Sequence, residues 1–381
     1  MIYFDSAATT LEKPISVPAA VSRAMTRLAS PGRGGHRASR AAAELVYQTR
    51  EQAAKLFHVG DLENVVLTSS ATHGLNIAIR SLVKEGGTVV ISGYEHNAVT
   101  RPLHAIPGVT VNVAAGPLFD ADGVYASFER AITPEVDAVI CNHVSNVFGF
   151  IQPVERIARL CRERGVPLIV DASQSAGILP VDMEGWGAAF IAMPGHKGLY
   201  GPQGTGLLLC GVDTVPLLFG GTGSLSARQE MPDFLPDRLE AGTQNVCGAA
   251  GLLAGMRFVS RRSISQIHAY ECELARYMMD SLERIPGVQV FRGRQDQSGL
   301  FSLTVDGLDC ETAAEELAKR DVAVRAGLHC APLAHQSAGT AESGAVRFSF
   351  SAFNRKEQVD RAAAILRQIV NDDIRARQIL V

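Results

Sequence analysis

Short apolar runs alternate with amphipathic stretches through the first two thirds of the chain. The amphipathic stretches Ala71–Val83 and Val154–Arg164 carry apolar residues at helical spacing. The apolar runs are rich in Val, Ile and Leu and are bounded by Gly, Pro or polar residues, which predicts buried strands. These runs are Asn64–Leu67, Thr88–Ser92, Val109–Ala114, Asp137–Cys141, Pro167–Val170, Ala188–Met193 and Gly206–Cys210. Strand and helix in alternation predict an α/β fold, with a mostly parallel seven-stranded sheet and helices on both faces.

The pattern changes after about residue 250. Here predicted strands and helices are mixed, which is typical of a smaller α+β domain at the C-terminus. The predicted helices are Ile264–Arg284, Glu311–Arg320 and a last one from about Lys356, and the predicted strands are Val288–Phe291, Gly299–Val305, Val322–Arg325 and Val346–Ser351. We therefore expect a large domain of residues 15–250, and a small domain formed by residues 1–14 and 251–381.

Composition narrows the classes of function. The chain has 381 residues, 46% of them hydrophobic, which is enough for a large core and more than one domain. With 20% charged residues and a net charge of −3, neither nucleic acid nor an anionic membrane is the expected partner. No apolar run is long enough to span a bilayer, and MIYFDSAATT lacks the features of a signal peptide. Seven scattered cysteines without a CxxC pair predict a reducing, cytoplasmic location and no structural zinc.

The segment PGHKGLYGPQGTG, Pro194–Gly206, follows a predicted buried strand and is dense in glycine. A lysine at the end of such a strand can lie in a polar pocket, where a lowered pKa makes its amine a Schiff-base nucleophile. Lys197 is therefore a candidate catalytic residue. The alternative is a surface turn with a solvated lysine.

Asp171 in VDASQSAG ends the preceding predicted strand. Ligands of open parallel sheets bind outside the carboxyl ends of the strands, so Asp171 and Lys197 are expected to face one crevice. A carboxylate there can pair with a protonated pyridine nitrogen. The alternative is an aspartate that caps the next helix.

Another motif, Leu67–Asn76, contains several small hydroxyl residues. These residues favour either a phosphate site at a helix N-terminus or simple capping of that helix.

Cys330 lies in VRAGLHCAPLAH, immediately before Pro332–Gly344, which is rich in Ala, Gly, Ser and His and is predicted to be a mobile loop. A nucleophilic thiol must be accessible and partly ionised, which such a position favours. The alternative is a small buried apolar residue.

His96 follows another predicted strand. It is either a structural residue or one that stacks on a flat cofactor and transfers protons.

The order and spacing of these motifs resemble the class V aminotransferase-like family of pyridoxal-phosphate enzymes, specifically the cysteine desulfurases and selenocysteine lyases. The resemblance extends from YFDSAATT near residue 3 to VRFSFSAFN at residues 346–354. GHK with the upstream DASQ carries the resemblance to the superfamily, and RAGLHCAP indicates the desulfurase branch. It implies the type I fold of pyridoxal-phosphate-dependent transferases and a homodimer.

The resemblance also implies roles around the cofactor ring. Lys197 resembles the lysine that forms the Schiff base with pyridoxal 5'-phosphate, and Asp171 the aspartate paired with the pyridine nitrogen. Gln174 matches a residue that hydrogen-bonds the phenolic oxygen, and His96 the histidine stacked on the ring.

Thr72 and His196 match phosphate contacts, and Thr243 resembles a phosphate contact donated across a dimer interface. Two positions depart from the family pattern. Pro194 stands where many desulfurases have a Ser or Thr phosphate ligand, and Ala71 stands where a second threonine is common. The phosphate site therefore has fewer hydroxyl groups than is usual in the family.

Asn146 and Arg347 match residues that hold the substrate carboxylate, and Arg325 matches a family arginine whose role the resemblance leaves open. The implied reaction converts L-cysteine into L-alanine. In it Lys197 acts as the base, His96 is a candidate for later proton transfers, and the Cys330 thiolate takes the sulfur as a persulfide. The mobile loop is expected to carry that persulfide to an acceptor protein, for example in iron–sulfur cluster assembly.

Three alternatives stay open. The first is a selenocysteine lyase, or another class V enzyme that does not use the thiol, such as an aminotransferase, a sulfinate lyase or an epimerase. The second is a sulfur-relay or scaffold protein that keeps only the fold, against which the joint presence of Lys197 and Asp171 argues. The third is a metal site of His329, Cys330 and His335, which lacks paired-ligand spacing, so no metal is expected.

Overall fold

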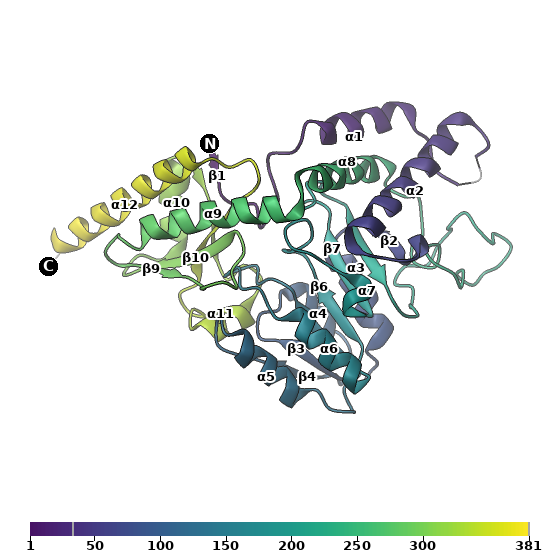
Figure 1. The fold of residues 1–381 in the computed structure, drawn as a ribbon, viewed down its shortest axis with the longest axis horizontal. Helices are drawn as coiled ribbons and strands as arrows, with labels where there is room; N and C mark the ends of the chain where they lie inside the picture. The colour runs from purple at the N-terminus through teal and green to yellow at the C-terminus, as the bar shows by residue number, and fades with distance from the viewer. Residues whose placement is uncertain (33, 380–381) are drawn as a thin grey trace.

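The computed structural model describes residues 1–32 and 34–379 (Figure 1). Its largest sheet has seven strands in the order β2-β8-β7-β6-β5-β3-β4. β8 pairs antiparallel with β2 and β7, and the pairs from β7 to β4 are parallel. The strands are β2 Val65–Thr68, β3 Thr88–Ser92, β4 Thr110–Ala114, β5 Ala138–Asn142, β6 Leu168–Asp171, β7 Phe190–Pro194 and β8 Gly206–Cys210. The predicted α/β fold with a mostly parallel seven-stranded sheet is confirmed.

Helices cover both faces of this sheet, because successive residues of a strand point to opposite sides. Val89 and Ile91 of β3 belong to a core that includes residues of α3 and α4. Val90, between them, belongs to a second core that includes residues of α5 and α6. The bounds are η1 Leu62–Asn64, α3 Ala71–Leu82, α4 Asn97–His104, α5 Ala121–Ala131, α6 Val154–Arg164 and α7 Met183–Trp186.

β4 departs from the prediction. It lies at the edge of the sheet, beside β3, and the residues from Thr110 to Val113 are exposed. Val111 and Val113 keep 38% and 43% of their surface exposed. The prediction that Val109–Ala114 is a buried strand is therefore wrong as to burial. Its composition is that of a buried strand, but whether a neighbouring strand covers its outer edge depends on the order of the strands.

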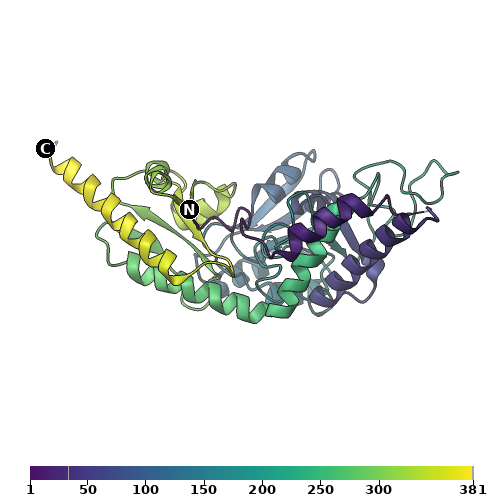
Figure 2. The same ribbon diagram turned by 90° about the horizontal axis from the view of Figure 1, so that it is seen from above.

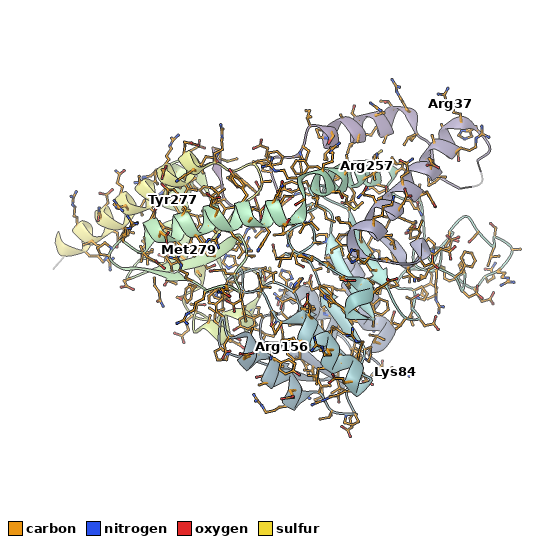
Figure 3. The ribbon with its side chains drawn as sticks, viewed as in Figure 1. Arg37, Lys84, Arg156, Arg257, Tyr277 and Met279 are labelled. Carbon is orange, nitrogen blue, oxygen red and sulfur yellow. The ribbon has the colours of Figure 1, made fainter. Side chains whose placement is uncertain are left out.

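Three helices that the sequence analysis did not predict pack together beside the sheet: α1 Ser16–Arg27, α2 Arg37–Phe57 and α8 Val246–Arg262. Figure 3 labels Arg37 on α2 and Arg257 on α8. Both line a cavity of about 990 Å³ between the three helices. The predicted domain boundary at residue 250 falls inside α8, whose contacts with α1 and α2 continue past that point.

The C-terminal region contains a four-stranded antiparallel sheet in the order β12-β13-β10-β9. Its helices pack on this sheet around a core of its own, with Phe301 and Phe348 stacked at 5.5 Å. The N-terminal strand β1 (Ile2–Tyr3) joins this region by pairing with β11. The elements are α9 Ile264–Leu282, β9 Val288–Phe291, β10 Leu300–Val305, α10 Cys310–Lys319, β11 Val322–Ala323, β12 Arg325–Gly327, α11 Pro332–Ala338, β13 Ala345–Ser349 and α12 Lys356–Ile379. The predicted smaller α+β region is confirmed.

Figure 2 shows α8 and α9, in green, passing from the large sheet into the C-terminal region.

Two predictions for the C-terminal region are wrong. Val322–Arg325 is not one strand, because β11 and β12 belong to different sheets. Pro332–Gly344 is not a loop throughout, because α11 occupies its first half. Within the described ranges, the helices are too short or too polar to cross a membrane.

Candidate active site

A cavity of about 100 Å³ lies at the carboxyl ends of β5, β6 and β7 and is called here the Lys197 cavity. Parallel strands end at the same edge of a sheet, so residues that follow them meet there. The residues from the sequence analysis that line it are Ala71, Thr72, His96, Asn146, Asp171, Gln174, Pro194, His196 and Lys197. Segments spread over about 130 positions of the chain are thus brought together, as the motifs predicted.

Lys197 follows the end of β7 by three residues. Removal of its ammonium group from water lowers its pKa to about 8, while the nearby Asp171 carboxylate acts in the opposite direction. At pH 7 about a tenth of the amine is therefore unprotonated, far more than for a solvated lysine, and the unprotonated amine is the form that acts as a Schiff-base nucleophile. The alternative of a solvated lysine in a surface turn does not fit this position.

Asp171 is 4% exposed at the end of β6. Its Oδ1 accepts a hydrogen bond of 2.9 Å from the backbone N–H of Ser173. One carboxylate oxygen therefore stabilises the turn after the strand, and the side chain also lines the cavity. The interpretation that Asp171 caps the next helix is wrong, because a turn follows β6 and the next helix, α7, has Asp182 as its N-cap.

His96 is the N-cap of α4, and its Nδ1 accepts a hydrogen bond of 2.9 Å from the Ala98 N–H. A ring nitrogen that accepts carries no proton, so the neutral ring has its proton on Nε2. Burial lowers the pKa of His96, and the Lys197 and Arg347 charges lower it further, although Asp171 opposes them. The structural role and the cavity-lining role thus belong to the same side chain.

The N-terminus of α3 also faces the cavity. Ser70 is its N-cap and accepts from the His73 N–H at 3.1 Å, and Ala71 and Thr72 form its first turn. The first N–H groups of a helix attract an anion. His196 lies nearby, and burial, together with the Lys197 and Lys13 charges, lowers its pKa to about 4.

The N-terminal segment contacts two residues that line the cavity, Gln174 and His196. Gln174 donates from Nε2 to the Ala7 carbonyl at 3.0 Å. Thr10 Oγ1 and Lys13 Nζ both donate to the His196 carbonyl, at 3.0 Å each. The motif YFDSAATT, which contributed only to the resemblance, therefore holds Gln174 and His196 in place.

Asp5 in that motif is a residue the sequence analysis missed. Its carboxylate accepts from Arg347 Nη2 at 2.9 Å and from Arg325 Nη2 at 2.8 Å. Arg347 is 2% exposed and also donates from Nη1 to the Asn146 carbonyl at 2.8 Å. Within the described chain, Arg347 Nε and Asn146 Oδ1 are buried without a hydrogen-bond partner. Two predicted substrate residues are thus adjacent and keep unused polar atoms. The signal for Asp5 is a charged residue in an otherwise apolar and small-residue N-terminal run.

Cys330 is exposed, whereas the other six cysteines are buried or half-buried. It lies in a turn between β12 and α11, so the predicted position before a mobile loop is corrected to a position before a helix. The Asn97 N–H donates to the Cys330 carbonyl at 2.7 Å, and Asn146 Nδ2 donates to the His329 carbonyl at 2.9 Å. The turn is thus attached to the residue after His96 and to a residue that lines the Lys197 cavity.

Thr243 is not brought to the Lys197 cavity of its own chain. It is exposed and lines a different cavity of about 250 Å³ beside β2 and β8. The expected contact with phosphate across a dimer interface therefore stays a prediction.

The Lys197 cavity fits pyridoxal phosphate. It offers a half-buried lysine whose amine has a lowered pKa, a carboxylate, a neutral histidine ring and a helix N-terminus. Among the residues that the structure describes, His196 has a buried Nδ1 without a hydrogen-bond partner, as a group reserved for a bound molecule would have. Pro194 supplies no donor, so the phosphate end depends on α3 and His196.

Comparisons with known proteins agree with this geometry. The aminotransferase class-V family matches residues 2–362. A probable cysteine desulfurase of Methanothermobacter thermautotrophicus is 31% identical over 97% of this chain and 94% of its own. The structure of a cysteine desulfurase from Thermococcus onnurineus is 30% identical, with a TM-score of 0.89 over 97% of this chain and 95% of that one. The cysteine desulfurase CsdA of Escherichia coli is 27% identical, with a TM-score of 0.85 over 97% and 94% of the two chains.

Proposed function

The chain belongs to the aminotransferase class-V family, whose enzymes use pyridoxal 5'-phosphate, and from this membership we propose that it is a cysteine desulfurase. The proposed reaction converts L-cysteine into L-alanine and leaves the sulfur on Cys330. The observation that carries the proposal is the turn of Cys330, an exposed thiol attached through Asn97 and Asn146 to the Lys197 cavity. Relatives named cysteine desulfurase at about 30% identity support it.

Residues of the Lys197 cavity would hold the cofactor. Lys197 would bind it covalently, Asp171 would pair with the ring nitrogen and His96 would lie against the ring. Gln174 would contact the phenolic oxygen, and Thr72, Ala71 and His196 the phosphate. When bound, the cofactor supplies an electron sink for the bonds of the amino-acid substrate.

Arg347 and Asn146 would bind the substrate carboxylate by donating from Arg347 Nε and from the second N–H of Asn146 Nδ2. The guanidinium is held by Asp5 and the Asn146 carbonyl before any substrate arrives, so little rotamer entropy is lost on binding. Arg325 is about half exposed and is paired with the same aspartate. It could exchange Asp5 for the substrate carboxylate, which a fully buried arginine could not do without leaving a buried charge unpaired.

Proton transfers would fall to two side chains. Lys197, with a pKa of about 8, can take a proton from the substrate α-carbon and return it elsewhere. His96 is neutral and carries its proton on Nε2, so this N–H can donate a hydrogen bond to the substrate, and the ring must take up a proton before it can act as an acid. Both groups line the same cavity, which would allow a proton to pass between them through the substrate.

The sulfur step balances with the groups present. The Cys330 thiolate forms a new S–S bond to the substrate sulfur, and the carbon–sulfur bond of the substrate breaks. The electron pair of that bond stays with the carbon skeleton, which takes protons and leaves as alanine. One cysteine and one thiol thus become one alanine and one persulfide. An added dithiol then reduces the persulfide to sulfide and regenerates Cys330.

Replacement of the thiol tests the proposal. In Cys330→Ala, production of alanine and sulfide from L-cysteine with a dithiol should fall at least about a hundredfold, because no nucleophile receives the sulfur. The cofactor absorbance should be unchanged. Cys247→Ala, which removes the half-buried thiol, is the matched control and should keep wild-type activity. Full activity of Cys330→Ala would instead indicate a class V enzyme that does not use the thiol. Measuring the activity with L-selenocysteine in parallel would distinguish a selenocysteine lyase from a cysteine desulfurase.

We also propose a homodimer in which Thr243 serves the partner's cofactor site, and a sulfur-acceptor protein that receives the persulfide. Thr243 is exposed and lies outside the Lys197 cavity of its own chain, which fits a contact with the site of a second copy. The exposed thiol of Cys330 would give an acceptor direct access.

A further inference from the structure

His335 is a buried histidine on α11 that takes no part in the proposed reaction. It has 0% of its surface exposed, and its ring lies 5.6 Å from that of His329, with 6° between the two planes. His329 immediately precedes Cys330 in the chain. The two rings and Thr340, which is also buried, form a row beneath the turn that presents the thiol.

Hydrogen bonds along this row have one possible direction when both rings are neutral. His329 Nε2 lies 3.3 Å from the Arg325 carbonyl, which can only accept, so His329 carries its proton on Nε2. His329 Nδ1 must then accept from His335 Nε2, 3.4 Å away. His335 Nδ1 is therefore without a proton and accepts from the Thr340 hydroxyl at 2.7 Å. Burial lowers the pKa of His329 to about 3 and that of His335 to about 4, so both rings are neutral at physiological pH.

The turn needs such support. His329 and Cys330 have φ of 51° and 55°, which places two consecutive residues with side chains in the left-handed region. That conformation is unfavourable for residues other than glycine, and surrounding contacts must stabilise it. The backbone of the turn is held by Asn97 and Asn146, and the side chain of His329 is held by Arg325 and His335.

We propose that His335, oriented by Thr340, is a positioning residue that fixes the His329 ring and so holds Cys330 in the conformation that presents its thiol. The inference rests on the proposed function of Cys330 as sulfur acceptor. His335 itself would touch neither substrate nor cofactor. If its role were only to fill space beside Phe148, any side chain of similar volume would serve.

Two amide substitutions separate these roles. Glutamine can place its amide nitrogen near the position of Nε2 and keep the donor to His329, whereas the shorter asparagine reaches only the position of Nδ1. In the holoenzyme, His335→Asn should lower kcat for alanine about tenfold with KM within twofold, because the thiol is displaced while substrate binding is not. His335→Gln should restore kcat to within about threefold of wild type.

Thr340→Val is the second test, because it keeps the shape and removes the hydroxyl that fixes the His335 tautomer. Like His335→Asn, it should lower kcat. The matched control is Thr49→Val, which removes a buried hydroxyl bonded to the Leu45 carbonyl on α2 and should leave kcat unchanged.

Hydrogen–deuterium exchange makes the test independent of activity. In His335→Asn and Thr340→Val the amide of Asn97, which is bonded to the Cys330 carbonyl, should exchange at least about fivefold faster than in wild type. Unchanged exchange and kcat in both variants, or equal loss in His335→Gln and His335→Asn, would overturn the inference. Failure of the proposed function would appear differently, as full activity in Cys330→Ala, and would leave the exchange result interpretable.

Discussion

At the scale of single residues, one carboxylate organises the charge of the candidate site. Asp5 lies between two guanidinium groups, so the three side chains together keep one positive charge. Arg347 is almost fully buried, and an unpaired charge there would be costly to desolvate. The remaining charge, with the unused N–H of Arg347 Nε, suits a substrate with one carboxylate.

Asp5→Asn should therefore destabilise the protein by about 3 kcal/mol, because it leaves the buried Arg347 without its counter-charge. KM for L-cysteine should rise more than kcat falls, since the arginines lose their fixed orientation. Chemical denaturation and steady-state kinetics measure the two effects. The control is Asp122→Asn, which breaks the exposed pair with Arg156 (labelled in Figure 3) and should change stability little. Equal stability of the two variants would contradict the role given to Asp5.

At the scale of elements, the ends of helices and strands place the chemistry. α3 and α4 begin with Ser70 and His96 as N-caps, and both caps line the Lys197 cavity. α11 begins with Pro332 at its first turn and ends at Gly339, whose φ is 73°. These are ordinary start and stop signals of a helix. The prediction of a loop gave more weight to the Ala, Ser and Gly content than to these signals, and it was wrong for that reason.

Ser70→Ala should cost about 1 kcal/mol of stability, because the His73 N–H loses its cap. It should also weaken binding of pyridoxal phosphate about fivefold, since the first turn of α3 is the proposed phosphate site. Absorbance titration of the apoenzyme measures this affinity. Ser263→Ala removes an equivalent cap from α9, away from the cavity, and should lose stability only. A similar loss of affinity in both variants would show that the effect is not local.

At the scale of the whole molecule, the first thirteen residues connect the large sheet with the C-terminal region. β1 pairs with β11 of that region, Asp5 binds arginines of β12 and β13, and Lys13 reaches the His196 carbonyl next to Lys197. The C-terminal region thus supplies Arg325, Arg347 and Cys330, and the large sheet and the segments that follow its strands supply the residues of the Lys197 cavity. A segment distant in sequence from most of these residues holds them in register.

The proposed dimer makes a prediction at the same scale. Thr243→Ala should weaken cofactor binding about tenfold if its hydroxyl bonds a phosphate in the partner subunit. Subunits carrying Lys197→Ala and Thr243→Ala are each defective alone. Mixed dimers should regain activity, because one of their two sites has both wild-type residues. The measurement is alanine production after the subunits are mixed, unfolded and refolded together. Absence of any regain would place Thr243 outside the site.

The sequence alone was enough to predict the alternation of strands and helices, and with it the large sheet and the smaller C-terminal region. Apolar periodicity is a local property, and Lys197 and Asp171 follow strands that are neighbours in a parallel sheet, so their meeting could be inferred from order alone. The presence of His96 and Asn146 at the same edge follows from the same rule.

Features that depend on contacts between distant segments became visible only in the folded chain. The exposure of β4 depends on its position at the sheet edge, and the pairing of Asp5 with Arg325 and Arg347 joins residues over 300 positions apart. The left-handed turn of Cys330 and the row from Thr340 to His329 depend on how α11 packs. Such contacts are selected by burial and hydrogen bonding in three dimensions, which no local pattern records.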